Sequence, residues 1–333
     1  MNNSVHFPDH SSLSDQASQL RELVERSRHD GQLRPAPLAT AIMVTGGKGG
    51  IGKSSLALNL AIALARLGSR ICLLDASLGL GHLDLMCGLN GYWNLGHVLA
   101  GSRQLSDIML DGPAGIHIVP GAGRLANPDC SSDCVGTDVR RQLATLESEH
   151  DVLLFDTGDG FHPFASRCAA AADTVLLVTT PEPTAIAGAY ATIKSLPASG
   201  EGRLLTLVNR ATSAGQAEDI HQRLAKTTRI FLESEPDTAG WIPEDPEMSR
   251  AINQQVPLMV QAIESPAAHA IQQLARRLIY QSPPNHQPTS LFEQLWLSST
   301  GPATVDVPKS EISEKNSNSL SQNVDLTRVG AVS

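Results

Sequence analysis

Residues 46–54 read Gly46-Gly47-Lys48-Gly49-Gly50-Ile51-Gly52-Lys53-Ser54, a glycine-rich run with a lysine near each end. Gly47 and Gly52, followed by Lys53 and Ser54, fit the G-x-x-x-x-G-K-[ST] pattern of a phosphate-binding loop, or P-loop. Glycine suits such a loop because backbone amides must approach phosphate oxygens closely, in conformations that a Cβ restricts. We therefore predict that this loop binds the phosphates of a nucleotide.

The sequence on either side of the loop favours this interpretation over a chance match. Residues 40–45 form a short β-type apolar run, and residues 56–67 form an apolar helical pattern that ends before Gly68. A loop between a strand and a helix receives the positive end of the helix dipole. In this position Lys53 supplies a charge for the β and γ phosphates, and Ser54 supplies a hydroxyl for Mg²⁺.

Apolar runs alternate with helical patterns from residue 40 to about residue 280. Strands are predicted at Ile42–Thr45, Arg70–Asp75, Ile116–Pro120, Val152–Asp156, Thr174–Thr180, Leu204–Asn209 and Gly240–Pro243, and helices at Leu56–Leu67, Val139–Glu149, Thr184–Leu196, Gln216–Phe231 and Pro266–Tyr280. Nearly continuous apolar runs are typical of strands that are buried on both faces. The predicted fold class is therefore α/β, a doubly wound, mostly parallel sheet with helices on both faces and its ligand at the carboxyl ends of the strands.

Two acidic residues stand where a P-loop protein needs them. Asp156 follows the apolar run 152–155, which is the arrangement of a Walker B carboxylate, and Asp75 follows the run 71–74. Parallel strands end at the same edge of a sheet, so we expect both carboxylates in the coordination shell of Mg²⁺ together with Ser54. The alternative is that each acid caps the helix that follows it.

Three regions differ in composition. Residues 1–39 contain one amphipathic helical pattern at residues 14–28 and a proline-containing linker before the first strand. Residues 40–280 hold the predicted P-loop domain. Residues 281–333 are rich in Ser, Asn and Pro and lack periodicity, so we expect them to be mostly disordered, apart from a short apolar segment at residues 291–297.

The bulk composition limits the possible functions. A formal net charge of −9 and a pI near 5.6 argue against general binding to nucleic acid. The sequence shows no apolar core of a signal peptide at its start and no apolar run long enough to span a bilayer. Five cysteines fit free thiols in a reducing compartment, so we predict a cytoplasmic protein. Cys130 and Cys134 have the spacing of half a metal site, but no second pair completes it.

Lys48, the additional lysine of the loop, makes this sequence similar to the deviant Walker A motif of the MinD/ParA ATPases. Further stretches resemble the flagellar branch of that family, called FlhG or FleN; they are Leu74-Asp75-Ala76-Ser77-Leu78-Gly79-Leu80, Leu83-Asp84, Asp156-Thr157-Gly158, Thr179-Thr180-Pro181-Glu182-Pro183-Thr184, Ala189-Tyr190-Ala191, Ile193-Lys194, Val208-Asn209-Arg210 and Ile242-Pro243-Glu244-Asp245-Pro246-Glu247. The heptapeptide Asp15-Gln16-Ala17-Ser18-Gln19-Leu20-Arg21 resembles the D-Q-A-x-x-L-R helix by which this branch engages the GTPase FlhF.

The resemblance implies roles for individual residues. It implies that ATP or ADP is bound with Mg²⁺, and that Lys48 reaches the nucleotide of the opposite subunit in an ATP-bound homodimer. The nucleotide contacts that it implies come from Gly47, Lys48, Gly49, Gly50, Ile51, Gly52, Lys53, Ser54 and Ser55 around the phosphates, and from Asn209, Arg210, Pro243 and Asp245 around the base. The side-chain amide of Asn209 offers one donor and one acceptor to the adenine edge. The residues implied to bind FlhF are Asp15, Gln16, Ala17, Leu20 and Arg21.

Two positions depart from the family's pattern. Ser77 stands where the family has a second aspartate that orients the attacking water. Because phosphoryl transfer depends on such positioning, losing this group costs on the order of a hundredfold in rate. Asp159 stands where the family usually has alanine, and we hypothesise that it partly replaces the missing carboxylate. Nucleotide binding is expected to be retained, whereas the rate of turnover is left open.

The apolar segment at residues 291–297 has two interpretations. Leu291, Phe292, Leu295 and Trp296 share one face of a short predicted helix, and MinD-like proteins often bind anionic lipid through such a helix. Glu293 is the only charged residue in the segment, so the electrostatic part of membrane affinity is absent. The alternative is that this segment packs on its own domain.

These observations predict an ATP-dependent dimerising switch, a P-loop ATPase that regulates flagellar number or placement through FlhF. One alternative is an ATP-bound scaffold or anti-activator of flagellar transcription with poor turnover. Another is a MinD-like division-site regulator or a ParA-like DNA partitioner, but neither explains the N-terminal heptapeptide, and the acidic balance disfavours DNA binding. Flagellar switch components and a flagellar transcription activator are further candidate partners, and the inner face of the cell membrane is a further candidate location.

Overall fold

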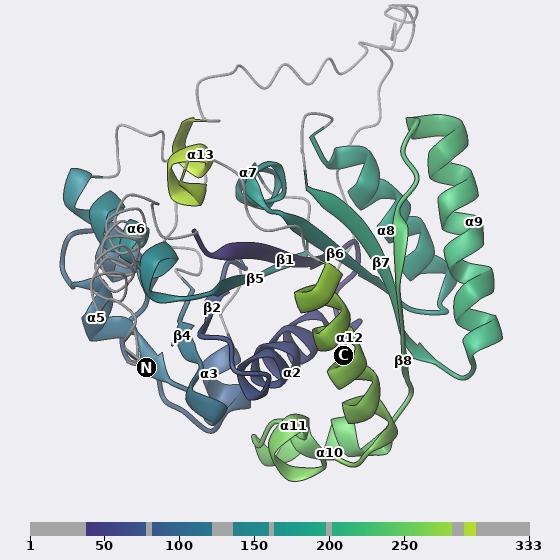
Figure 1. Cartoon of the computed structure of the whole chain (residues 1–333), viewed down its shortest axis with the longest axis horizontal. Helices are drawn as coiled ribbons and strands as arrows, with labels where there is room; N and C mark the ends of the chain where they lie inside the picture. The colour runs from purple at the N-terminus through teal and green to yellow at the C-terminus, as the bar shows by residue number, and fades with distance from the viewer. Residues whose placement is uncertain are drawn as a thin grey trace, which may run out of the picture. The chain divides into compact units, whose positions relative to one another are not determined.

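An eight-stranded sheet forms the centre of the protein (Figure 1). The structure is a computed structural model that describes residues 38–77, 82–121, 136–159, 163–197, 202–281 and 290–297. Within these residues the strands are β1 (Thr40–Gly46), β2 (Ile71–Asp75), β3 (Leu110–Asp111), β4 (His117–Val119), β5 (Val152–Asp159), β6 (Thr174–Thr179), β7 (Arg203–Ala211) and β8 (Asp237–Pro243). Their order across the sheet is β3-β4-β2-β5-β1-β6-β7-β8, and every neighbouring pair is parallel except β3 and β4.

The sheet confirms the predicted α/β fold class. Each predicted strand is present, with its ends shifted by a few residues at most. Strand β3 was missed because two residues are too few to show a pattern of burial. Its antiparallel position at the edge is common in sheets that are otherwise parallel.

Helices connect the strands and cover the sheet. They are α2 (Lys53–Arg66), α3 (Leu83–Met86), α4 (Leu95–Leu99), α5 (Leu105–Ile108), a 3₁₀ turn η1 (Pro113–Gly115), α6 (Thr137–Glu149), α7 (Pro163–Ala171), α8 (Pro183–Ser195), α9 (Ala214–Leu232), α10 (Pro246–Gln254), α11 (Leu258–Gln261), α12 (Pro266–Gln281) and α13 (Leu291–Leu297). The five longer helices predicted from the sequence are α2, α6, α8, α9 and α12. Helix α7 was missed because its run of small residues lacks the contrast between apolar and polar faces that predicts a helix.

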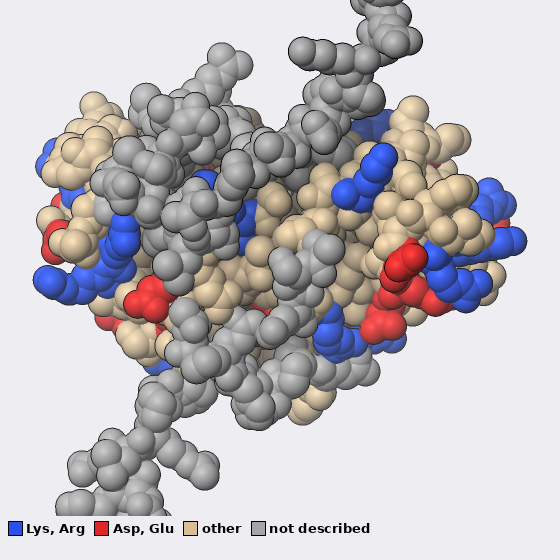
Figure 2. Space-filling view, turned by 90° about the horizontal axis from the view of Figure 1, so that it is seen from above, with Lys and Arg blue, Asp and Glu red and all other residues tan. Residues whose placement is uncertain are grey.

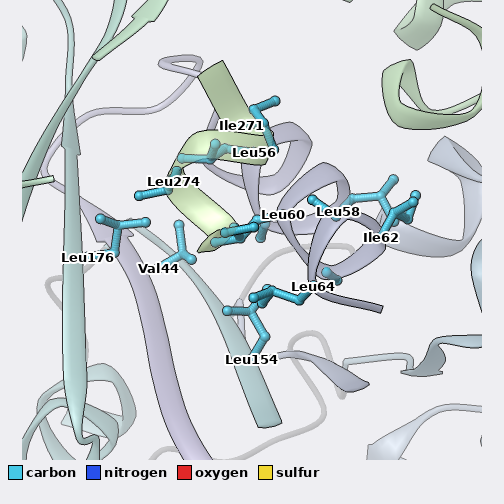
Figure 3. Packing of buried hydrophobic residues seen from close by; sticks show 14 of the residues in the cluster. Val44, Leu56, Leu58, Leu60, Ile62, Leu64, Leu154, Leu176, Ile271 and Leu274 are labelled. Atoms are coloured by element: carbon cyan, nitrogen blue, oxygen red, sulfur yellow. The ribbon is translucent and has the colours of Figure 1, made fainter. Parts of the chain in front are cut away.

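The alternation of side chains along β1 assigns the helices to two faces. Ile42 and Val44 belong to the apolar cluster that contains α2 and α12, whereas Ala41 and Met43 belong to the cluster that contains α6, α7 and α13. Figure 3 shows α2 in the first cluster, where residues such as Leu60 and Leu64 lie against Val44, Leu154 and Leu176 from three adjacent strands. Helix α2 is apolar on most sides because the sheet, α11 and α12 enclose it.

The glycine-rich loop lies at the carboxyl end of β1, between the ends of β5 and β6. From β1 the chain passes through α2 to β2 on one side, whereas from β5 it crosses to β6 on the other side. In doubly wound sheets, ligands bind where the direction of winding reverses in this way. The topology therefore places the loop at the position expected for a ligand site.

Helix α13 packs on the domain. Leu291, Phe292 and Leu295 are buried, and the helix contacts α6 and α7 (Figure 1). Glu147 of α6 accepts hydrogen bonds from Leu291 N (3.1 Å) and Phe292 N (3.0 Å) and so caps the start of this helix. This arrangement matches the second of the two interpretations of the segment, because Leu291, Phe292 and Leu295, which would enter a membrane in the first, lie in the core.

Candidate functional site

The loop is shaped by glycines in the left-handed region. Gly50 and Gly52 have φ angles of +77° and +92°, which residues with a Cβ rarely adopt. Gly52 precedes the first residue of α2, so the amides of the first helical turn are directed toward the loop. This is the backbone arrangement that binds a phosphate group, and it agrees with the strand, loop and helix predicted from the sequence.

The two lysines of the loop have different surroundings. Lys53 is only 6% exposed, and its Nζ donates to the carbonyl oxygen of Lys48 at 2.7 Å. The side chain of Lys48 is 37% exposed and extends away from the loop to the start of α8. There it forms an ion pair with Glu182 and donates to Thr184 Oγ1 at 2.9 Å. Lys53 is therefore buried within the loop, whereas the side chain of Lys48 lies on the surface of the protein.

The predicted acidic pair is brought together at the ends of β2 and β5. Asp75 and Asp156 are register partners in these adjacent strands, and both are buried, with 4% and 1% exposure. Burial raises the pKa of Asp75 to about 6, the hydrogen bond from Ser77 opposes this shift, and the nearby charge of Asp156 adds to it. The carboxylates do not serve as the caps of following helices that the sequence left open, since no helix begins directly after either residue.

Ser77 holds Asp75 in place. Its Oγ donates to Asp75 Oδ1 at 2.6 Å, and its backbone N–H donates to the same oxygen at 3.1 Å. A Cβ added at Gly158 would lie 3.0 Å from the Cβ of Ser77, so the residues after β2 and within β5 are in contact here. Asp159 follows Gly158, and its Cα is the register partner of Gly46. The backbone of Asp159 therefore lies beside the loop, while its side chain is outside the described residues.

A pocket of about 220 Å³ adjoins the loop. Of the residues that the sequence assigned to nucleotide binding, it is lined by Gly52, Ser55, Asn209, Arg210, Pro243 and Asp245. Met248 and Ile252 of α10 also line it and were not predicted. A larger cavity of about 480 Å³ lies between β8 and α12, but Pro243 is the only predicted site residue in its wall. The smaller pocket is therefore the one that belongs to the site.

Two of the pocket residues already have hydrogen-bond partners in the protein. Asn209 Nδ2 donates to the carbonyl oxygen of Ile51 at 2.8 Å and so connects β7 to the loop. Asp245 accepts from Glu247 N at 2.9 Å and from Ala267 N at 3.0 Å. Burial acts to raise the pKa of Asp245, but these amide donors outweigh it and hold the pKa below its ordinary value. Asp245 thus holds α10 and α12 together at the wall of the pocket.

Two residues near the loop had no role assigned from the sequence. Glu182 and Thr184 appear in a stretch that resembles the family, yet nothing marked them as contacts of Lys48. Their position just after β6 could have indicated this contact, because the carboxyl end of β6 lies beside that of β1. Glu182 is the N-cap residue of α8, and Pro183 after it favours the extended backbone that Glu182 adopts.

The residues present fit a nucleotide with Mg²⁺. The loop offers a cradle that side chains do not fill, because a Cβ added at Gly50 would meet no atom within 4 Å. Ser54, Asp75 and Asp156 offer the oxygen ligands that Mg²⁺ prefers. In the described part of the chain, no group of three or more His, Cys, Asp or Glu side chains is placed to hold a metal on its own. The predicted partner-binding residues 15–21 and the pair Cys130 and Cys134 lie outside the described residues.

The sequence of this chain is similar to those of known proteins. The family described as cellulose biosynthesis protein BcsQ matches residues 39–279. The antiactivator FleN of Pseudomonas aeruginosa is 35% identical over 249 residues, which cover 74% of this chain and 88% of FleN. The flagellum site-determining protein YlxH of Helicobacter pylori is 29% identical over 225 residues, which cover 67% of this chain and 75% of YlxH.

The fold is also similar to that of a solved structure. The cell division ATPase MinD of Pyrococcus furiosus superimposes with a TM-score of 0.61 at 23% sequence identity. The matched region covers 73% of this chain and 99% of MinD. The MinD structure supports the assignment of the doubly wound P-loop fold.

Substitution of Asp75 tests the electrostatic cost of the buried acids. The pKa of this carboxyl is about 6 in the folded protein and has an ordinary value of 3.8, so the folded state holds the proton more tightly than the unfolded state. Its contribution to stability is therefore present below pH 4 and is lost as the pH rises through about 6. We predict that Asp75→Asn raises the free energy of unfolding of the nucleotide-free protein by about 2–3 kcal/mol at pH 7.5 and changes it little at pH 4.

Urea denaturation of the wild type and the variant across this pH range measures the difference. Asparagine keeps an oxygen that can accept from Ser77, so the comparison isolates the charge. The control is Glu244→Gln, because Glu244 is an exposed carboxylate away from the buried pair. A difference between Asp75→Asn and wild type that does not grow between pH 4 and pH 7 would contradict the prediction.

Proposed function

The chain belongs to the MinD/ParA family of P-loop ATPases, and on this premise we propose that it is an ATP-dependent dimerising switch that regulates the number or placement of flagella. The names of its relatives FleN and YlxH support the flagellar part of this proposal. The position of Lys48 is the observation that supports the proposed ATP-dependent dimer. Its side chain leaves its own loop and is 37% exposed, so it is available to a nucleotide in a second subunit.

In this proposal, different residues of the site bind the phosphates, the base and the Mg²⁺ ion. Lys53 and the glycine-rich backbone would hold the phosphates, while Asn209 and the pocket around it would hold the base. Ser54, Asp75 and Asp156 would hold Mg²⁺, which when bound neutralises charge that develops on the phosphates. For Asn209 to read the base, its side chain must exchange the carbonyl oxygen of Ile51 for the adenine edge.

Dimerisation requires Lys48 to leave Glu182. Glu182 and Lys48 both lie at the surface, where an ion pair contributes little and is easily replaced. A triphosphate carries more negative charge than one carboxylate, so the phosphates of a second subunit would compete effectively for the ammonium group. Nucleotide that binds only the dimer then shifts association by mass action, and hydrolysis reverses the shift.

The partner proposed for the switch is the GTPase FlhF, contacted through residues 15–21. This assignment rests on the likeness of the heptapeptide to the D-Q-A-x-x-L-R helix. A helix of this length is marginally stable in water and gains order by packing against a partner. Flagellar switch components and a flagellar transcription activator remain further candidate partners.

A second candidate function is a scaffold or anti-activator that stays bound to ATP. Two observations favour it: position 77 supplies a hydroxyl that is directed to Asp75, and the relative FleN is described as an antiactivator. In this case the protein would bind its partners for long periods because it hydrolyses ATP slowly. A MinD-like division-site function is the third candidate, because septum site-determining MinD proteins are also among the relatives. The higher identity to FleN and the heptapeptide favour the flagellar role over it.

We place the switch in the cytoplasm, and no nucleic acid is proposed as a partner. Cys72, Cys87 and Cys168 are free thiols, which suits a reducing compartment. Across the described segments, no helix has the length and apolar character needed to cross a membrane. On the face seen in Figure 2, Lys and Arg stand beside Asp and Glu at both ends, a mixed pattern that does not favour a phosphate backbone.

Replacement of Lys48 tests the dimer. Wild-type protein in saturating non-hydrolysable ATP analogue should scatter light as a dimer, with twice the monomer mass of 35.3 kDa. Lys48→Ala should remain at the monomer mass, because the ammonium that neutralises the partner's phosphates is absent. The matched control is Lys194→Ala, an exposed lysine in the last turn of α8, which should dimerise normally. An unchanged dimer mass in Lys48→Ala would remove the basis of the proposed switch.

Truncation of the N-terminus tests the partner. We predict that deletion of residues 1–30 abolishes binding to FlhF and changes the number of flagella per cell, while ATP-dependent dimerisation is kept. Deletion of residues 1–13 is the control, because it leaves the heptapeptide in place. Equal effects of the two deletions on both readouts would argue against residues 15–21 as the contact.

Restoring an acid at position 77 tests the account of turnover. We predict that Ser77→Asp raises the rate of phosphate release from ATP by about ten- to a hundredfold, since it returns a water-orienting carboxylate. Single-turnover kinetics with saturating enzyme measure the chemical step directly. An unchanged or lower rate would show that the missing carboxylate does not limit hydrolysis.

Asp159→Ala separates the two departures from the family. If Asp159 partly replaces the missing carboxylate, Asp159→Ala lowers the rate when position 77 is serine but has little effect in the Ser77→Asp background. Equal rates for wild type and Asp159→Ala would exclude that role for Asp159.

A further inference from the structure

The first half of the P-loop touches α8 through two glycines. A Cβ built at Gly47 would lie 2.0 Å from the carbonyl oxygen of Gly188, and one built at Gly188 would lie 2.7 Å from the carbonyl oxygen of Gly47. Both distances are below the 3.0 Å that real Cβ atoms respect. Backbone atoms face each other on both sides, so no side-chain rotation relieves the overlap. The two segments therefore meet at a distance that requires glycine at both positions.

We propose that Gly188 is a positioning residue for the P-loop. By leaving room for Gly47, it sets where the loop lies and thereby where both of its lysines stand. The inference rests on the proposed function, because it concerns the nucleotide site of that function. It adds a residue that lies outside the loop and the pocket.

The helix itself offers no reason for this glycine. Gly188 lies in the interior of α8 between Ala187 and Ala189, and glycine destabilises a helix interior by about 1 kcal/mol relative to alanine. A glycine in such a place has a packing or functional reason. The contact with Gly47 is the packing reason that the structure shows.

The loop is the side that yields when the contact is crowded. Helix α8 is anchored because Ala189 and Ile193 are buried against Leu177 and Leu224. In addition, Thr192 Oγ1 donates to the carbonyl oxygen of Gly188 at 3.0 Å. The middle of the loop is exposed, and a Cβ at Gly50 would meet nothing within 4 Å. A methyl group at position 188 would therefore displace the loop and leave α8 in place.

A displacement of Gly47 reaches both lysines. Lys48 follows Gly47 directly, and its carbonyl oxygen accepts the hydrogen bond from Lys53 Nζ at 2.7 Å. The side chain of Lys48 is held by Thr184 and Glu182 at the start of the same helix. Helix α8 thus contacts the loop at its backbone and at its exposed lysine. Because catalytic and binding groups tolerate little misplacement, a shift near 1 Å is enough to affect nucleotide binding strongly.

Replacement of Gly188 with alanine tests the proposal. We expect Gly188→Ala to raise the dissociation constant of a fluorescent ATP analogue with Mg²⁺ by ten- to a hundredfold. The midpoint of thermal unfolding without nucleotide should stay within a few degrees of wild type. Gly215→Ala in α9 is the matched control, because a Cβ at that helical glycine would meet nothing within 4 Å. This control should leave the dissociation constant unchanged.

Amide hydrogen exchange without nucleotide locates the displacement. In Gly188→Ala, exchange should become faster in residues 46–54 and stay as in wild type in the α9 residues 214–232. An unchanged dissociation constant, or unchanged exchange in the loop, would overturn the proposal. A Gly188→Ala chain that fails to fold while Gly215→Ala folds would also overturn it, because Gly188 would then support the fold and not the loop. Wild-type protein that does not bind ATP would refute the proposed function instead, and the exchange result would still decide on Gly188.

Discussion

The structure depends on close approach of backbone segments at the carboxyl end of β1. Gly46 and Gly47 face the backbone oxygens Val178 O and Gly188 O at distances that exclude a Cβ, and Gly52 lies against the side-chain Nδ2 of Asn209. Three elements, β6, α8 and β7, therefore converge on one loop. The glycines leave the amides accessible, and the surrounding elements determine where the amides lie. A loop that was equally rich in glycine but lacked these neighbours would have no defined shape to offer a phosphate.

Two buried carboxylates at the same edge of the sheet destabilise the folded protein. Asp75 and Asp156 are buried side by side at the ends of adjacent strands, and burial raises the pKa of Asp75 to about 6. Two like charges in a place of low dielectric oppose each other and destabilise the nucleotide-free fold. The strands can hold them because the apolar cluster around α2, visible in Figure 3, stabilises the sheet independently of the site. Such a cost in stability is typical of functional sites, whose activity can require a destabilised arrangement.

Much of this arrangement followed from local patterns in the sequence. The loop, the strands on both sides of it and the acids at the strand ends all have signals within about ten residues. The pocket residues Asn209 and Pro243 came from the resemblance, and the structure brings them to one wall. The contacts of Lys48 with Glu182 and Thr184 span 134 and 136 residues, so no local pattern reveals them. Glu147 lies within a predicted helix, yet its role in capping α13 depends on a segment more than 140 residues away.

Ser77 affects both the stability of the folded site and its capacity to hydrolyse ATP. A second carboxylate at this position would lie beside Asp75 and Asp156 and would increase the repulsion between buried charges. The serine hydroxyl instead donates to Asp75 at 2.6 Å, which favours the ionised form that Mg²⁺ needs. Relative to the aspartate that the family resemblance implies at this position, serine therefore lowers the electrostatic cost of the folded site and keeps the Asp75 carboxylate oriented, but under the proposed function it lacks the group that would orient the attacking water. In the proposed switch, slower hydrolysis lengthens the time spent as a dimer, and a protein that acts by holding partners benefits from that longer lifetime.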